Sequence, residues 1–346
     1  MTKAISEKKE SSKIKRPNRV LIKEIAEVCG VSTATVSRVI NNNGRFSDET
    51  RKKVLEAVER LGYKTNIVAK SLRTKKTKSI SIVVPDITNE FFAKIILTIQ
   101  DFFFTKGYSV LVCNTNEDPG KEELHLKDLE AKWVDGLIYF FCMEDKGQID
   151  AVRKKIPVVF VDRNPNRKGA VVVESDNYTG GFIATEELIK AGCRRIVILK
   201  HVLTNSTIVG RYNGYRDALK KYGIEFDPQL ALDMYITPDA AKNAISNLIE
   251  KGVSFDGIFA CTDGLAAGAL LALKKYNIKV PEEVKLVGFD NVSISEYNSP
   301  SITTINQDKK QLGKIAAQLL FDMINGSPIQ EKDIIVPVEL VRRETT

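Results

Sequence analysis

The sequence is poor in the residues that most enzymes and metal sites need. Among its 346 residues there are two histidines, His125 and His201, and a single tryptophan. This inventory argues against a histidine-ligated metal and against a Ser/His/Asp triad. The G-x-S-x-G, Walker A and H-E-x-x-H motifs are also absent. We therefore expect no enzyme activity, no metal and no cofactor.

Paired cysteines and long apolar runs are missing too. The five cysteines are far apart in the sequence and none belongs to a C-x-x-C pair, which fits neither a zinc site nor a disulfide framework. No run approaches the roughly 18 apolar residues of a membrane-spanning helix, and the N-terminal segment is too polar for a secretory signal. These absences predict a cytoplasmic protein with small buried thiols.

Positive charge is concentrated at the N-terminal end. The net charge is +8, but residues 1–78 contain 20 Lys+Arg against 8 Asp+Glu, and the remainder contains 32 against 36. A small basic segment is thus joined to a large, mildly acidic body. Basic N-terminal segments commonly bind polyanions, most often nucleic acid.

Residues 22–61 have the pattern of three short helices. The first has apolar residues at i, i+3, i+4 and i+7 and ends at Gly30, where a left-handed residue is favoured. Ser32 is placed to cap a second helix, and a third covers residues 49–61. Two short helices around a glycine-containing turn, followed by a supporting helix, are typical of a helix-turn-helix domain.

From residue 79 onward, strand and helix patterns alternate. We predict strands at 80–84, 109–113, 136–139, 158–161, 170–173, 195–199, 257–260, 285–288 and 334–338. We predict helices at about 90–105, 121–132, 178–190, 209–221, 239–250, 263–275 and 308–324. Continuous apolar strands alternating with helices indicate doubly wound parallel sheets. About ten strand units exceed one comfortable sheet, so two α/β subdomains are expected.

The second helix presents polar side chains at its start. Thr33, Ala34, Ser37 and Arg38 lie on its exposed side, as in a helix that reads the major groove. An arginine can donate two hydrogen bonds to guanine, which discriminates bases by about 1–3 kcal/mol. The alternative is an ordinary amphipathic helix with a solvated polar face.

The motifs of the whole chain resemble the lactose-repressor (LacI/GalR) family of transcription regulators. The resemblance rests on IKEIAEVCGVSTATVSRVIN at 22–41, TRKKVLEAVERLGY at 50–63, VDR at 161–163, TDGLAAGA at 262–269 and VGFDN at 287–291. It covers residues 20–343. It implies a helix-turn-helix domain followed by a two-lobed domain like that of periplasmic binding proteins, in a homodimer on a pseudo-palindromic operator in double-stranded DNA.

The resemblance also implies the DNA-binding residues and the domain limits. The expected DNA contacts are Thr33, Ala34, Ser37, Arg38 and Asn41 in the recognition helix, and Asn66, Ala69 and Leu72 in a hinge helix, where Leu72 would enter the minor groove. The expected domains are a disordered basic tail (1–19), the helix-turn-helix domain (20–63), the hinge helix and linker (64–78) and the two-lobed domain (79–346). Lobe one is expected at about 79–161 plus 292–322, and lobe two at about 162–291 plus 323–343.

An effector is expected in the cleft between the lobes, outside the carboxyl ends of the strands. The resemblance to periplasmic sugar-binding proteins, and to their ribose-binding branch, implies effector contacts from Asp86, Asn89, Phe91, Phe92, Asp162, Arg163, Arg211, Thr262, Asp290 and Gln307. Thr262 departs from the asparagine of ribose binders. Other interpretations are that the two phenylalanines are core residues, that Asp162 and Arg163 form an inter-lobe salt bridge, and that Asp290 caps a loop.

Several functions are consistent with these features. The first is a repressor of a carbohydrate-use operon, controlled by a small sugar such as ribose and associated with the nucleoid when bound to its operator. The second keeps the DNA-binding regulator but replaces the sugar with a phosphorylated protein corepressor. A sugar-binding transport protein conflicts with the basic N-terminal segment, and an enzyme conflicts with the missing motifs. The short segment after the last predicted strand favours a dimer over a tetramer.

Overall fold

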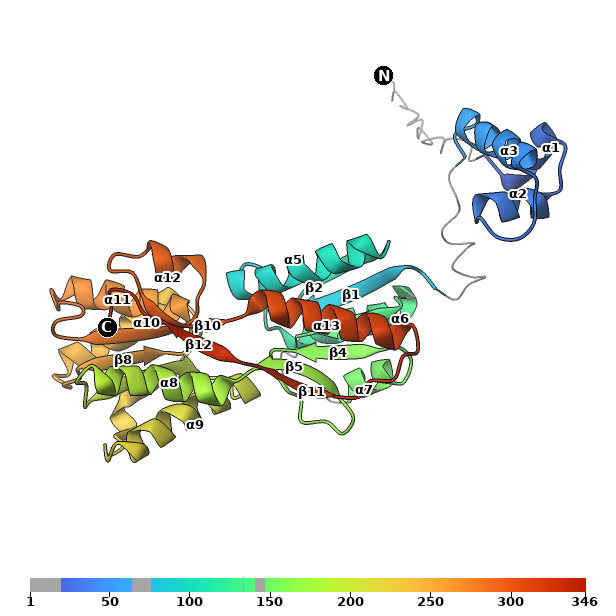
Figure 1. Ribbon diagram of the computed structural model, residues 1–346. Coiled ribbons are helices and arrows are strands. Elements are labelled where there is room, and N and C mark those ends of the chain that lie inside the picture. Colours follow the sequence, from blue (N-terminus) through green and yellow to red (C-terminus); the bar gives the residue numbers. More distant parts are fainter. Residues whose placement is uncertain (1–19, 64–75, 133, 141–146) are drawn as a thin grey trace, which may run out of the picture. The chain divides into compact units, whose positions relative to one another are not determined.

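A computed structural model describes residues 20–63, 76–132, 134–140 and 147–346. The chain divides into two compact units, one ending at Lys75 and one beginning at Lys76, and each unit is described by itself (Figure 1). The predicted tail at 1–19 and the predicted hinge helix lie outside the described residues. Within the described ranges, no helix has the length and apolar character needed to cross a membrane.

The first unit is a three-helix domain with its own core. It consists of α1 (Ile22–Cys29), α2 (Thr33–Ile40) and α3 (Asp48–Arg60). Gly30 has φ +66°, a left-handed conformation that ends α1, and the Ser32 and Ser47 hydroxyls accept hydrogen bonds from the backbone at the starts of α2 and α3. Leu55, an apolar residue of α3, is 44% exposed. The core is built from Ile25, Ala26, Cys29, Val36, Val39, Val54 and Ala57.

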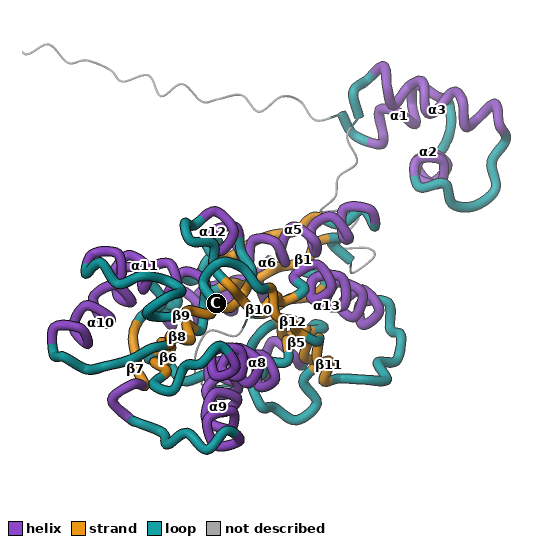
Figure 2. The backbone as a smooth tube through the Cα atoms, turned by 60° about the vertical axis from the view of Figure 1, so that its left-hand side comes forward, coloured by secondary structure: helices purple, strands orange, loops and turns teal. Residues whose placement is uncertain are grey.

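The first sheet of the second unit defines lobe one. Its strands are β1 (Ser79–Val84), β2 (Ser109–Asn114), β3 (Gly136–Tyr139), β4 (Val158–Val161), β5 (Val171–Ser175) and β11 (Asp333–Val336), in the order β11-β5-β4-β3-β1-β2, all parallel. The helices are α5 (Glu90–Thr105), α6 (Pro119–Lys132), α7 (Gln148–Arg153) and α13 (Lys309–Ile324). Figure 2 shows α5 and α13 side by side on this sheet, with apolar side chains of both in one core.

The second sheet defines lobe two. Its strands are β6 (Ile196–His201), β7 (Ala231–Met234), β8 (Gly257–Ala260), β9 (Lys285–Asp290), β10 (Thr303–Gln307) and β12 (Val338–Val341), in the order β12-β10-β9-β8-β6-β7. Only β12 is antiparallel to its neighbour. The helices are α8 (Asn177–Lys190), α9 (Ser206–Lys221), α10 (Pro238–Glu250), α11 (Asp263–Lys275), α12 (Ser293–Tyr297) and the 3₁₀ turn η1 (Pro228–Leu230). In sheets of parallel strands such as these, the carboxyl ends of the strands point toward the cleft between the lobes.

The chain passes between the lobes three times, and this corrects the expected lobe limits. The passages lie between β5 and α8, between β10 and α13, and at Pro337 between β11 and β12. The expected limits placed residues 171–175 and 333–336 in lobe two and residues 303–307 in lobe one, but their strand pairing reverses each assignment. The predicted strand at 334–338 is in fact divided, because Pro337 has no N–H for either ladder; Figure 1 shows the two halves in different lobes.

Candidate functional site

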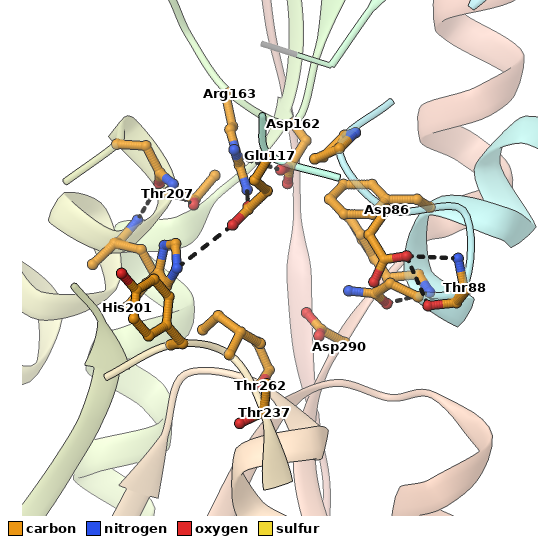
Figure 3. Close-up of a pocket in the computed structure, with 18 of the residues that line it drawn as sticks. Asp86, Thr88, Glu117, Asp162, Arg163, His201, Thr207, Thr237, Thr262 and Asp290 are labelled. Atoms are coloured by element: carbon orange, nitrogen blue, oxygen red, sulfur yellow. Dashed lines mark hydrogen bonds and ion pairs between the residues drawn. The ribbon is translucent and has the colours of Figure 1, made fainter. Parts of the chain in front are cut away.

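A cavity of about 560 Å³ lies between the two lobes and receives side chains from both (Figure 3). Its walls follow the carboxyl ends of the parallel strands, as expected for this class of fold. Lobe one contributes Pro85, Asp86, Thr88, Asn89, Phe91, Phe92, Asn116, Glu117, Asp162 and Arg163. Lobe two contributes His201, Asn205, Thr207, Ile208, Arg211, Tyr235, Ile236, Thr237, Thr262 and Asp290.

The structure brings nine of the ten expected effector-binding residues to this cavity. The tenth, Gln307, does not line it. Gln307 is fully buried and its Nε2 donates a 2.7 Å hydrogen bond to Oδ1 of Asp290. Gln307 therefore orients the Asp290 carboxylate without lining the cavity itself.

The lobe-one wall combines fixed polar groups with an aromatic surface. Oδ1 of Asp86 accepts hydrogen bonds from the backbone N–H and the hydroxyl of Thr88, at 2.9 and 2.7 Å. Oδ1 of Asn89 accepts from the N–H of Phe91 at 3.0 Å and so caps α5. The rings of Phe91 and Phe92 lie edge to face, 5.3 Å apart. Both phenylalanines belong to the lobe-one core and also line the cavity.

Glu117 connects the lobes across the cavity. Its Oε1 accepts a 3.2 Å hydrogen bond from Arg163 Nη2, and its Oε2 lies 3.7 Å from Nε2 of His201 on the opposite lobe. Burial lowers the pKa of His201, although the Glu117 carboxylate acts in the opposite direction. Asp162 and Arg163 both follow β4 and their charged groups are 3.7 Å apart. That pair lies within lobe one and is not an inter-lobe salt bridge.

Arg211 is a buried cation held in place on three sides. Its Nε donates to Oδ1 of Asn177 at 2.8 Å, and its Nη1 donates to the carbonyl of Cys261 at 2.5 Å. The guanidinium lies 3.7 Å from the centre of the Phe289 ring, a cation–π contact. The helix that carries Arg211 was predicted at about 209–221, but α9 (Ser206–Lys221) begins earlier because the Asn205 side chain caps it.

Lobe two contains two buried carboxylates near each other, those of Asp263 and Asp290. Oδ1 of Asp263 accepts from the Thr304 hydroxyl at 2.6 Å and its Oδ2 accepts from the N–H of Val292 at 2.8 Å. Burial raises the pKa of Asp263 to about 8, with a further contribution from the nearby Asp290 charge, and burial raises the pKa of Asp290 to about 6. Asp290 and Asp162 also have φ of +109° and +72°. Such left-handed conformations are strained for non-glycine residues and concentrate at functional sites.

The recognition helix of the first unit carries the expected DNA-binding residues. Thr33, Ala34 and Arg38 are exposed, whereas Ser37 and Asn41 are half-buried. Asn41 Nδ2 donates to the Ser37 carbonyl at 2.7 Å, which ends the helix. The other expected contacts, Asn66, Ala69 and Leu72, lie outside the described residues.

Both units match known protein families. Residues 21–66 match the model for "Bacterial regulatory proteins, lacI family", and residues 185–346 match that for a "Periplasmic binding protein-like domain". The chain is 33% identical over 326 residues to the HTH-type transcriptional repressor PurR of Pasteurella multocida, covering 94% of this chain and 98% of the relative. The chain belongs to the lacI family of bacterial regulatory proteins. It is a DNA-binding transcription regulator and not an enzyme.

Solved structures agree with this family and with its two-lobed architecture. A lac repressor dimer bound to operator and the anti-inducer ONPF is 25% identical, with a TM-score of 0.86 over 95% of this chain and 99% of that one. A LacI family regulator from Enterococcus faecium with bound ribose is 27% identical, with a TM-score of 0.70 over 78% of this chain and 98% of that one.

The patterns used for this lacI-family chain missed several cavity residues. His201 ends β6, and the strand-end rule applied to the predicted strand at 195–199 could have found it. Tyr235 follows β7, a short edge strand that was not predicted. Asn116 and Glu117 lie in a loop with φ of +54° and +55°, and no periodic signal marks them. Of these residues, Glu117 and His201 form a contact between the two lobes.

Proposed function

We propose that this protein is a homodimeric repressor of a carbohydrate-use operon, and that an uncharged sugar bound in the inter-lobe cavity controls its affinity for DNA. Ribose is the first sugar to test, since the Enterococcus faecium relative has ribose bound. The observation that carries the proposal is the cavity itself: both lobes place hydrogen-bonding side chains around it, beside an aromatic wall. Sites of this composition suit the hydroxyl groups and the apolar face of a sugar ring.

The charges of the cavity favour an uncharged effector. Four carboxylates line it, from Asp86, Glu117, Asp162 and Asp290, against two guanidinium groups, from Arg163 and Arg211. Both arginines already donate to protein acceptors. An added phosphate would lie among these carboxylates, and like charges at close range are unfavourable. A neutral polyol can instead donate its hydroxyl protons to them.

Contacts between the lobes provide a route for the effector to act. Glu90, at the start of α5, accepts from the N–H and hydroxyl of Ser293 at 2.9 and 2.6 Å, and so caps α12 of the opposite lobe. The N–H of Asn164 donates to the Ser206 hydroxyl at 2.8 Å. An effector that prefers one lobe arrangement would shift the population toward it.

That shift would reach the DNA through the dimer. We infer that Thr33, Ala34, Ser37, Arg38 and Asn41 read a pseudo-palindromic operator in the major groove. Asn66, Ala69 and Leu72 would form a hinge whose spacing depends on the lobe arrangement. Operator binding would place the protein on the nucleoid.

Calorimetric titration of the full chain tests the effector proposal. The panel contains ribose, other pentoses, hexoses and their phosphates. We expect saturable binding of an uncharged sugar, and weaker or no binding of its phosphate. Asp290→Asn should weaken that binding, whereas Asp239→Asn, on the exposed face of α10, should not. If no sugar binds and a phosphorylated carrier protein instead tightens operator binding, a protein corepressor controls this regulator and the sugar proposal is wrong.

A further inference from the structure

A second pocket opens at the opposite edge of lobe one, where the amino ends of β4 and β5 lie. It has a volume of about 700 Å³ and lies outside the inter-lobe cavity, with no residue in common. Its lining residues are Asp150, Arg153, Lys154, Lys155, Ile156, Pro157, Val158, Gly169, Val171 and Met323. Neither family membership nor the proposed sugar accounts for it.

The pocket is positively charged. Three consecutive basic residues, Arg153, Lys154 and Lys155, line it, and of the described lining residues Asp150 is the one acid. That carboxylate is bracketed by Arg153 at 3.0 Å and by the guanidinium of Arg167. Because one carboxylate lies between two guanidinium groups, the net charge of this part of the pocket is positive. The inter-lobe cavity has the opposite balance.

Arg153 is oriented by two hydrogen bonds to the protein. Its Nη1 donates to Oδ1 of Asp150, and its Nη2 donates at 3.3 Å to the carbonyl of Lys168 on the facing loop. The Arg153 side chain is 19% exposed and its guanidinium lies 5.8 Å from the Phe160 ring centre. Basic residues are favoured at the C-terminal end of a helix, and Arg153 is the last residue of α7. Its Nη2, however, donates to the carbonyl of Lys168, outside its own helix.

We propose that this basic pocket is a second small-molecule site, which binds a phosphorylated metabolite. Arg153, Lys154 and Lys155 would hold the phosphate, because guanidinium and ammonium groups form strong charge-assisted hydrogen bonds with phosphate oxygens. The organic part would lie on the apolar floor formed by Ile156, Pro157, Val158, Val171 and Met323. The regulator would then bind an uncharged ligand in the inter-lobe cleft and an anionic ligand in lobe one, at the amino ends of β4 and β5.

Titration of the full chain with pyrophosphate and with adenosine monophosphate tests the site. The informative variant is Lys154→Glu/Lys155→Glu, because both lysines are exposed and their replacement leaves the Arg153–Asp150 contact in place. The matched control is Lys274→Glu/Lys275→Glu, an exposed adjacent pair on α11 of lobe two. Both double variants change the net charge equally.

We expect saturable binding of both probes to the wild type, at least tenfold weaker binding to the pocket variant, and unchanged binding to the control. Binding should persist in Asp290→Asn, the variant expected to weaken ligand binding in the cleft. No saturable binding to the wild type, or equal weakening in both double variants, would overturn the proposal. If the pocket variant instead lowers the salt dependence of DNA binding and leaves pyrophosphate binding unchanged, these lysines contact the DNA backbone, and the small-molecule assignment is wrong.

Discussion

Two arginines show how differently this regulator presents its functional side chains. Arg38 on the recognition helix is exposed to solvent, whereas Arg211 in the cleft is 4% exposed and donates to Asn177 and to a backbone carbonyl. The exposed Arg38 keeps its hydrogen-bonding groups available for the proposed DNA contact. The buried Arg211 is fixed by protein acceptors, so it should contribute to protein stability as well as to the proposed effector binding. The two regions should therefore respond differently to the loss of a side chain.

The largest effect is expected from Arg211→Ala. The change leaves the Asn177 oxygen, the Cys261 carbonyl and the nearby Asp290 carboxylate without their buried cation. Removing one partner of a buried charged network costs about 3 kcal/mol or more of unfolding free energy. Urea denaturation measures this loss, and calorimetry should show that effector binding is lost too. Lys220→Ala, on the exposed face of the same helix, is the control and should change neither; an equal response of the two variants would contradict the buried role.

Arg38→Ala should instead affect DNA binding and leave protein stability unchanged. We expect operator binding to weaken by about 1–3 kcal/mol if the guanidinium reads a guanine, with the unfolding free energy unchanged. Fluorescence anisotropy with operator and with random DNA measures the difference. Lys23→Ala, on the exposed side of α1, removes the same charge and should affect both DNAs alike. Equal weakening on both DNAs by Arg38→Ala would identify it as a phosphate contact.

Asp290→Asn tests the buried cleft region through the pH dependence of the unfolding free energy. The pKa of Asp290 is raised by burial to about 6, above the ordinary value near 4. The folded state thus binds this proton more tightly than the unfolded state. The resulting stabilisation is present below about pH 4 and is lost as the pH rises through about 6.

The variant should remove this fall in unfolding free energy, roughly 1–2 kcal/mol between about pH 4 and 6. Denaturation curves of wild type and variant across that range give the difference. Asp263, with its pKa near 8, should extend the fall to higher pH, and less so in the variant, because the Asp290 charge contributes to that raised pKa. A wild type and variant with parallel pH profiles would show that Asp290 titrates normally.

The smallest effect is expected at the start of the recognition helix. The Ser32 hydroxyl accepts a 3.1 Å hydrogen bond from the N–H of Thr35. Ser32→Ala should cost about 1 kcal/mol of stability in the helical domain, seen as a lower melting temperature by circular dichroism. Ser32→Asp retains an acceptor and should restore most of the loss. No difference between the two variants would show that the cap contributes little.

The contrast between the regions also explains what the sequence could predict. The proposed DNA-reading face is local: α2 covers Thr33–Ile40 with Asn41 as its C-cap, and helical spacing alone identifies its exposed side. Most strands were predictable because each is a continuous apolar run. Two strands of lobe two were not: β7 is four residues long, and β10, with the sequence TTINQ, has no apolar run.

The cleft was predictable only in part. Asp86, Asp162 and Asp290 follow apolar strands, so the topology of a parallel sheet places them at one edge. Glu117 and His201 meet through tertiary structure, across 84 positions of sequence and between two lobes. The lobe limits were misplaced for the same reason. Strand pairing, which local hydrophobicity does not encode, assigns β5, β10 and β11 to their sheets.

The most direct test of the account is operator affinity with and without the effector. An operator selected from random DNA by the full chain would be titrated by anisotropy at fixed salt, first alone and then with the saturating sugar found by calorimetry. We predict at least a tenfold change in affinity for the wild type, and no sugar-dependent change for Arg211→Ala or Asp290→Asn under conditions where both are folded. A sugar that binds the cleft but leaves operator affinity unchanged would contradict the central claim that the cleft controls DNA binding.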